Sequence, residues 1–271
     1  RHSEISAWCS QLSAEKSSTV VRRAHGVLAA ILDVAVRDRR ISANPARGVP
    51  LPRRAPKRRS YLSHAQVGAL VRQSGDSSAL VAFLAYTGLR WGEATALRVR
   101  DVDMLRRRVS VVENAVRIGS VVHVGSPKSH RARSVPFPAF LSEAIARECE
   151  GKTREQLVFG DGVTHVRATY GERGWWARAI AACQTDDADF PRITPHDLRH
   201  TAASLAISAG ANVKAVQAML GHASATMTLD TYADLFDDDL EAVATRLDEA
   251  QARAGVGDLW GLAPAKGSRK A

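Results

Sequence analysis

The feature that most limits how this chain can fold is a basic, proline-rich stretch between residues 44 and 59. It reads Asn44-Pro-Ala-Arg-Gly-Val-Pro-Leu-Pro-Arg-Arg-Ala-Pro-Lys-Arg-Arg59 and holds four prolines and six basic residues. Proline breaks helices and like charges repel one another, so no helix is expected to run through it. We therefore predict a linker at residues 51–60, between a small N-terminal domain (1–50) and a larger one (61–254), with residues 255–271 as a C-terminal tail.

The charge of the chain narrows the classes of partner. Its 271 residues contain 38 Lys and Arg against 28 Asp and Glu, which gives a net charge of +10 and a pI near 10.1. Such a balance favours a polyanion, and nucleic acid before a membrane surface. A basic protein that is merely soluble is the plainer interpretation of the same numbers.

The cysteines and the apolar runs indicate the cellular compartment of the protein. Cys9, Cys149 and Cys183 are far apart and form no C-x-x-C pair, which predicts reduced thiols in a reducing cytoplasm. The longest apolar run, from Ala79 to Leu89, is too short to span a bilayer. We therefore expect a cytoplasmic protein without a membrane partner.

Hydrophobic periodicity predicts a fold that is mainly α with one small antiparallel β-sheet. In the N-terminal domain, a helix over residues 4–12 precedes a longer helix capped at Ser17–Thr19, whose apolar stripe includes Val20, Val27 and Ile31. The predicted strands are 108–116, 120–124 and 133–137, and the other predicted helices begin near His64, Ser78, Leu89, Pro138, Arg167, Pro195, Asn212 and Asp237. A basic hairpin loop, Gly125–Ala132, is expected to join the last two strands.

Residues whose side chains can take part in catalysis are concentrated toward the C-terminal end of the sequence. The stretch Ile193-Thr-Pro-His-Asp-Leu-Arg-His-Thr-Ala-Ala-Ser204 opens a predicted helix. His196 and Arg199 are three residues apart, so both side chains are expected on one helical face. The next predicted helix ends at Leu220-Gly-His222, and Tyr232 follows. Two imidazoles, a fixed cation and a phenol suit an anion better than an apolar core, and the anion we expect is a DNA phosphodiester.

Six side chains together contain the groups needed to attack that anion: Arg90, Lys128, His196, Arg199, His222 and Tyr232. Guanidinium groups can bind two phosphate oxygens and stabilise the charge that develops during attack. A phenol can act as the nucleophile, and a lysine or histidine can protonate the departing oxygen. Each residue alone has a plainer structural interpretation, so the prediction depends on their order and spacing.

Several of these residues lie in sequence boxes that resemble those of tyrosine recombinases, the phage integrase family. The boxes are Thr87-Gly-Leu-Arg-Trp-Gly-Glu93, Thr194-Pro-His-Asp-Leu-Arg-His-Thr201 and Leu220-Gly-His222, followed by Tyr232. The resemblance covers essentially the whole chain, and Ala35–Pro45 is most similar to actinobacterial phage and prophage integrases. It implies a catalytic domain preceded by part of a helical core-binding domain, without a visible arm-type DNA-binding domain.

The resemblance implies a role for each site residue. Phosphate binding is implied for Arg90, Arg199 and His222. Lys128 would protonate the 5′-oxygen, His196 would assist proton transfer, and Tyr232 would be the nucleophile. Glu93 resembles the supporting carboxylate of the first box. His200 is expected to be packed or hydrogen-bonded within its own helix.

The implied activity is site-specific recombination of double-stranded DNA for integration or excision of a mobile element in a bacterial host. Attack by Tyr232 would leave a 3′-phosphotyrosyl bond and a free 5′-hydroxyl, with no ATP, metal or other cofactor. Four protomers would exchange strands through a Holliday junction, and an accessory DNA-bending protein is a further partner. Residues 237–262 are hypothesised to pack on a neighbouring protomer, with packing on their own domain as the alternative.

Three other classes of function compete with this interpretation. His196 and His200 imitate the two histidines of an H-E-x-x-H zinc helix, although Asp197 replaces the glutamate and Arg199 would place a cation beside the metal. A non-catalytic DNA-binding protein would explain the charge but not the order of the six residues. A type IB topoisomerase would use the same tyrosyl chemistry without bringing two sites together.

Overall fold

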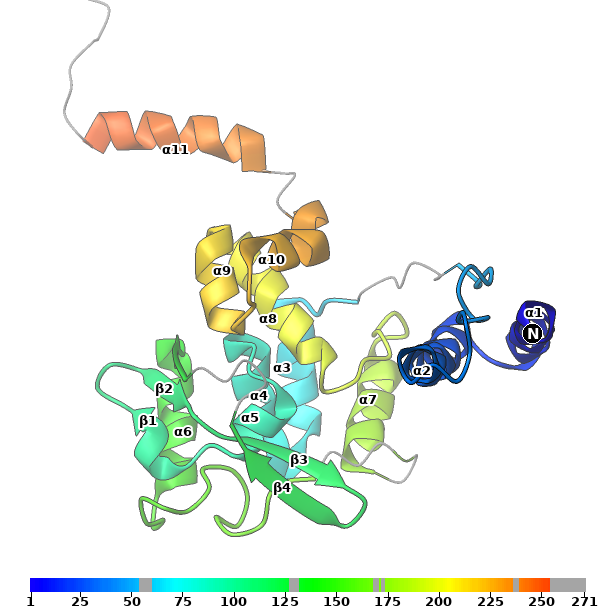
Figure 1. Cartoon of the computed structure of the whole chain (residues 1–271). Helices are drawn as coiled ribbons and strands as arrows, with labels where there is room; N and C mark the ends of the chain where they lie inside the picture. The colour runs from blue at the N-terminus through cyan, green and yellow to red at the C-terminus, as the bar shows by residue number, and fades with distance from the viewer. Residues whose placement is uncertain (54–59, 127–131, 168–170, 172–173, 236–238, 254–271) are drawn as a thin grey trace, which may run out of the picture. The chain divides into compact units, whose positions relative to one another are not determined.

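The computed structural model describes residues 1–53, 60–126, 132–167, 171, 174–235 and 239–253 (Figure 1). Its internal contacts divide the chain into two units, Arg1–Arg58 and Arg59–Ala271. Parts of the predicted linker, Lys128 and the predicted tail at 255–271 lie outside the described residues.

The N-terminal unit contains two helices, α1 (His2–Glu15) and α2 (Ser18–Arg37). The hydroxyl of Ser17 accepts a hydrogen bond from Val20 N, as the predicted cap requires. The buried face of α2, however, is formed by Val21, His25 and Ala29.

The apolar stripe predicted for α2 is only partly buried: Leu28 and Leu32 are half-buried, whereas Val20, Val27 and Ile31 are exposed. The segment after α2 folds back onto the neighbouring face, which carries His25 and Ala29. The side-chain amide of Asn44 donates to Ala29 O at 2.9 Å, and His25 Nε2 lies 3.0 Å from Ala46 O. Polar contacts of this kind leave no periodic signal in the sequence of the helix.

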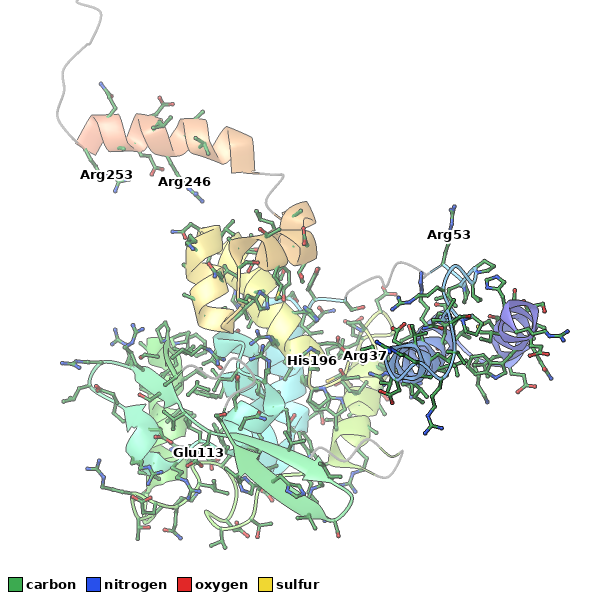
Figure 2. All side chains as sticks on the ribbon, in the orientation of Figure 1. Arg37, Arg53, Glu113, His196, Arg246 and Arg253 are labelled. Atoms are coloured by element: carbon green, nitrogen blue, oxygen red, sulfur yellow. The ribbon has the colours of Figure 1, made fainter. Side chains whose placement is uncertain are left out.

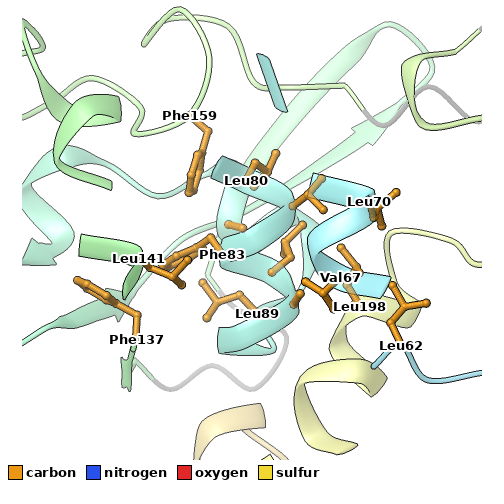
Figure 3. Close-up of a cluster of buried hydrophobic side chains, with 14 of the residues drawn as sticks. Leu62, Val67, Leu70, Leu80, Phe83, Leu89, Phe137, Leu141, Phe159 and Leu198 are labelled. Atoms are coloured by element: carbon orange, nitrogen blue, oxygen red, sulfur yellow. The ribbon is translucent and has the colours of Figure 1, made fainter. Parts of the chain in front are cut away.

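The core of the second unit is built around α4 (Ser78–Thr87), a helix that is apolar on nearly all sides (Figure 3). It packs against α3 (His64–Gln73) and α8 (Asp197–Ser208). Phe83 is fully buried and meets the rings of Phe137 and Phe159. Burial on every side explains why α4 lacks a polar face. The start of α8 is therefore fixed against the end of α4, where two of the sequence boxes meet.

The strands form two small antiparallel sheets instead of the single sheet that was predicted (Figure 1). One sheet has the order β1-β2-β5, from β1 (Val102–Asp103), β2 (Arg108–Val111) and β5 (Arg133–Pro136). The other is the hairpin of β3 (Asn114–Ile118) and β4 (Val121–Gly125).

Two predictions about these strands are wrong. The predicted strand 108–116 is divided between β2 and β3, which belong to different sheets. β4 pairs with β3, and β5 pairs with β2, so Gly125–Ala132 does not join two paired strands. The buried Val109 and Val111 hold β2 in the main core, whereas Ile118 and Val121 of the hairpin are exposed.

The remaining helices are short. They are α5 (Trp91–Thr95), α6 (Ser142–Cys149), α7 (Trp175–Asp186), α9 (Val213–Leu220), α10 (Ala225–Tyr232) and α11 (Asp239–Arg253), with 3-10 turns at Val99–Asp101 and Ala139–Leu141 among others. α7 begins eight residues later than predicted from Arg167 (175 − 167), because Gly174 is extended and forms its N-cap. Along the described ranges, none of these helices has the length and apolarity to cross a membrane.

Candidate active site

Tyr232 is the last residue of α10 and is buried. Ser224 caps the helix by accepting from Met227 N, which fixes where it begins. The tyrosine ring lies in a small apolar cluster with Ala203 and Ile207 of α8 and Val216 and Leu220 of α9, and only 1% of its surface is exposed. Its hydroxyl is the polar end of an otherwise apolar side chain, and it lies 2.8 Å from Nδ1 of His200.

Arg199 is held in the core by two backbone carbonyls. Its guanidinium donates to Gly88 O and to Leu220 O, at 2.5 Å each, and the residue is 4% exposed. These carbonyls lie at the C-terminal ends of α4 and α9, where the helix dipoles favour a cation. Burial, followed by the neighbouring charge of Arg90, lowers the pKa of Arg199 to about 10. The guanidinium therefore stays charged at neutral pH.

Gly88 makes this arrangement possible. It ends α4 in the left-handed region, with φ of +65°, and a Cβ there would lie 2.7 Å from Cδ2 of Leu220. Only glycine adopts this conformation without strain and also leaves room for the neighbouring helix. The glycine of the first sequence box is thus required for helix packing and for holding Arg199.

Arg90 and Arg133 meet at one buried carboxylate. Glu93 accepts from Arg90 Nη1 at 2.8 Å and from both terminal nitrogens of Arg133, at 3.0 and 2.6 Å. Burial opposes the ionisation of Glu93, but the hydrogen bonds and charges of Arg133 and then Arg90 outweigh it and hold its pKa below the ordinary value. The carboxylate of the first box therefore positions two guanidinium groups, one of them from β5.

The end of α9 organises a further part of the site. Arg133 Nε donates to Met219 O at 3.4 Å, and a Cβ on Gly221 would lie 2.9 Å from the Arg133 side chain. Gly221 has φ of +66°, and this turn leads directly to His222, whose Nδ1 lies 2.9 Å from Thr228 Oγ1. Burial, followed by the charges of Arg199 and Arg90, lowers the pKa of His222 to about 4. His222 is therefore neutral at pH 7.

The two histidines at the start of α8 lie in different surroundings. His196 is the N-cap residue and is exposed (Figure 2). Arg199 is buried, so His196 and Arg199, which were predicted to share one helical face, differ in exposure. The rings of His196 and His200 meet edge to face, with centroids 5.5 Å apart. His200 is packed, one of the two expected placements, since it is half-buried and its ring lies against that of Tyr232, and its Nδ1 faces the hydroxyl of Tyr232 on α10.

Four of the six predicted residues lie close enough to interact through their charges. Arg199 interacts with the charges of Arg90 and Tyr232, and His222 interacts with both arginines. Lys128 lies outside the described residues. Arg133, the first residue of the predicted strand 133–137, is not among the six predicted residues, although it is one of the guanidinium groups at the centre of the cluster.

The balance of charge in this cluster is positive. Arg90, Arg133 and Arg199 carry three cations, and Glu93 is the carboxylate that pairs with two of them. One carboxylate cannot neutralise three guanidinium groups, so the cluster is suited to an anion with several oxygens.

Two other features of the unit are separate from this cluster. A cavity of about 520 Å³ is lined by Trp91, by the β3–β4 hairpin and by His165–Arg167, and its lining includes neither Tyr232 nor the clustered arginines. Within the described ranges, no group of three His, Cys, Asp or Glu side chains is placed to hold a metal ion.

The sequence matches the model of the phage integrase family over residues 60–238. The chain therefore belongs to the phage integrase family. It is 29% identical over 233 residues to the integrase of Mycobacterium phage L5, covering 83% of this chain and 61% of the relative. It is 31% identical over 223 residues to the putative prophage phiRv2 integrase of Mycobacterium tuberculosis, covering 78% of this chain and 58% of the relative. The chain thus spans about three fifths of the length of these curated relatives.

Solved structures confirm the predicted fold class. The Tn1549 transposon integrase in complex with a circular intermediate DNA superposes with a TM-score of 0.74 at 23% identity, covering 91% of this chain and 85% of that one. A lambda integrase dimer bound to a core site gives a TM-score of 0.56 at 17% identity, covering 83% and 80%. The mostly helical fold with small antiparallel sheets is that of tyrosine recombinases.

Proposed function

We propose that this chain cuts and rejoins double-stranded DNA at specific sites, as the catalytic part of an integrase. The observation that carries the proposal is the pairing of Arg90 and Arg133 with the carboxylate of Glu93, with Arg199 within electrostatic range of this group and of Tyr232. A phosphodiester under attack gains charge on its non-bridging oxygens, and fixed guanidinium groups stabilise that charge. Family membership and the order of the six residues support the same reaction.

In the proposed reaction, Tyr232 attacks the scissile phosphate while Arg90 and Arg199 bind its oxygens. The products are a 3′-phosphotyrosyl bond and a free 5′-hydroxyl. The 5′-hydroxyl of a second strand can then attack the phosphotyrosyl bond and rejoin the DNA. His222 is suited to hydrogen-bond the phosphate in its neutral form, since its pKa is lowered to about 4. Lys128 is proposed as the general acid for the 5′-oxygen, and His196 as a group that assists proton transfer. The reaction conserves the energy of the phosphodiester, so we propose that it needs no cofactor.

The remaining partners are part of the same proposal. We propose that residues 1–50 contact DNA as part of a core-binding domain, and that the basic linker at 51–60 follows the phosphate backbone. Four protomers would assemble on two core-type sites, with an accessory DNA-bending protein in some reactions. The site of action would be the nucleoid in the cytoplasm of a bacterial host.

The C-terminal helix supports an assembly of several protomers. Val243 and Leu247 lie one turn apart on α11 and are 47% and 65% exposed. An exposed apolar pair on a helix is suited to a protein groove. We propose that this segment packs on a neighbouring protomer when the chains assemble on DNA.

A covalent-trapping assay tests the proposed chemistry. The substrate is a pool of duplexes with a randomised centre and a nick at a fixed position, so that the short cleaved strand diffuses away. The chain is incubated with this pool in EDTA, and denaturing gels are inspected for a protein–DNA adduct. Sequencing of the trapped DNA then supplies a defined site for later assays. Tyr232→Phe is the matched control.

An adduct that forms in EDTA and is absent with Tyr232→Phe supports a tyrosine nucleophile and contradicts the zinc alternative. Binding without an adduct, in this chain and in a longer chain with upstream residues, would contradict the proposal and favour a DNA-binding protein. Supercoil relaxation by a monomer, without joining of two sites, would favour a topoisomerase.

A further inference from the structure

We propose that His200 accepts the phenolic proton of Tyr232 when the tyrosine attacks DNA. This inference rests on the proposed function and names the group that activates the nucleophile. It differs from the role given to His196, which the resemblance associates with proton transfer. The distinguishing observation is direct contact, because His200 Nδ1 lies 2.8 Å from the hydroxyl of Tyr232.

The surroundings of Tyr232 favour proton transfer to this nitrogen. The ring lies among buried aliphatic side chains of α8 and α9, which can neither donate nor accept a proton, and Tyr61 packs against the same cluster. His200 is half-buried and reaches the hydroxyl from one turn beyond the exposed His196. A general base must lie within about 2.6–3.2 Å of the proton donor, and this contact meets that condition.

The charges around the pair favour the ionised phenol. Arg199 attracts the ionised form of Tyr232, and Arg90 and Arg133 interact in turn with Arg199. Other titratable groups near His200 include His196, by ring contact, and His222, by charge. A phenolate formed here is attracted by the guanidinium group of Arg199, which is already in place.

The phenolic proton passes to His200 Nδ1, which makes the ring an imidazolium, while the tyrosine oxygen forms a bond to phosphorus. The bond between phosphorus and the 5′-oxygen breaks, and that oxygen takes a proton from the general acid. In rejoining, the 5′-hydroxyl returns its proton to the general acid as its oxygen attacks phosphorus, and the departing tyrosine oxygen recovers its proton from His200.

The second unit contains a matched pair that serves as a control. His64 Nδ1 lies 2.9 Å from the hydroxyl of Tyr86, with the rings stacked at 5.6 Å. The atoms and the distance match those of His200 and Tyr232, but His64 is exposed and belongs to α3. Removing it disturbs a histidine–tyrosine contact without touching the arginine cluster.

The test compares His200→Asn and His200→Ala with His64→Asn in single-turnover cleavage of the DNA identified by trapping. Asparagine places an acceptor oxygen near the position of Nδ1 but cannot take up a proton. We expect both His200 variants to cleave more slowly by a factor on the order of 10². We expect His64→Asn to cleave at the wild-type rate. Thermal unfolding of each variant separates loss of folding from loss of chemistry.

Two chemical substitutions show whether the His200 variants lack the general base or the general acid. A 5′-bridging phosphorothiolate has a sulfur leaving group that needs no proton, so it corrects loss of the general acid but not loss of the base. We expect Lys128→Ala to recover on this DNA and His200→Asn to remain slow. A fluorinated tyrosine at position 232 ionises at lower pH, and we expect it to restore His200→Asn toward the wild-type rate.

The inference is overturned if His200→Asn cleaves at the wild-type rate, or if the phosphorothiolate alone restores it. It is also overturned if fluorinated tyrosine leaves the defect unchanged, which would indicate a structural role. Failure of the wild-type chain to form any adduct is a different result. That result would count against the proposed function itself.

Discussion

Glu93 and Arg133, forty positions apart in the sequence, form a bidentate ion pair in which Nη2 and Nη1 of Arg133 lie 2.6 and 3.0 Å from the carboxylate oxygens. The pair joins α5 to β5 and is nearly excluded from solvent, since the Glu93 side chain is 0% exposed and that of Arg133 is 11% exposed. The same carboxylate holds Arg90. The positions of two guanidinium groups in the candidate site therefore depend on one buried glutamate.

Replacing Glu93 by glutamine is expected to destabilise the second unit by about 3–5 kcal/mol, because two guanidinium groups lose their buried partner. Urea unfolding at neutral pH measures the change. Glu113→Gln is the control, since Glu113 pairs with Arg98 and Arg100 near the surface, at 3.1 and 3.5 Å. We expect the control to cost about 0–1 kcal/mol. Equal losses in the two variants would contradict the special role of Glu93.

Gly88→Ala is expected to lower stability by about 1–2 kcal/mol from the left-handed backbone alone, with a further loss from contact with Leu220. Gly68→Ala, in the interior of α3, is the control with the opposite sign. Its Cβ would meet the flexible Arg72 side chain at an ordinary 3.5 Å, so helix propensity predicts a gain of about 0.5–1 kcal/mol. Thermal or urea unfolding measures both. A neutral Gly88→Ala would show that α4 and α9 can separate without cost.

His222 is expected to make the chain less stable as the pH falls from 6.5 to 4. Its pKa is lowered from 6.5 to about 4 in the folded chain, so between these values the unfolded chain binds more protons. Stability then rises with pH across this window. The lowered pKa of Glu93 adds a loss at more acidic pH, below the ordinary carboxyl range.

The difference between the wild-type chain and His222→Gln isolates this effect. We expect the variant to show a shallower dependence of unfolding free energy on pH between 6.5 and 4. Parallel curves would indicate that His222 titrates normally. Inorganic phosphate is expected to raise the pKa of His222, because an anion in the cluster offsets the charges of Arg199 and Arg90.

DNA binding is expected to weaken steeply with salt, because phosphate contacts release counterions. If Arg133 contacts a phosphate along with the other two arginines, Arg133→Gln should reduce the slope of log K against log salt by about 0.9. Arg147→Gln, on the exposed face of α6, is expected to leave the slope unchanged. Fluorescence anisotropy over a range of salt concentrations measures both slopes. An unchanged slope for Arg133→Gln would confine that arginine to holding Glu93.

Deleting residues 237–271 is expected to leave the unfolding free energy of the second unit nearly unchanged and to prevent assembly on DNA. Val243→Asp with Leu247→Asp is a milder version, since both side chains are exposed on α11. Analytical ultracentrifugation with the trapped DNA site measures the assembly. Tetramers formed by the truncated chain would contradict packing between protomers. A large loss of stability would favour packing on its own domain.

The local structure of this protein was largely predictable from its sequence. Ser17, Ser63 and Asn212 cap helices where their side chains predict a start, and Gly88 ends a helix where it predicts a stop. These capping effects depend on residues a few positions apart along the chain and can therefore be predicted from the sequence. The order of arginines, histidines and tyrosine likewise predicted the family.

The tertiary structure decided which of these residues touch. The contact of His200 with Tyr232, the pair of Glu93 with Arg133, and the carbonyls of Gly88 and Leu220 on Arg199 all join distant segments. It also decided which face of α2 is buried and how the strands are divided between two sheets. Periodicity reports which side of an element is apolar, but pairing depends on the packing of all elements together. The sequence by itself therefore determined the elements and the chemical groups, and the packing determined the site.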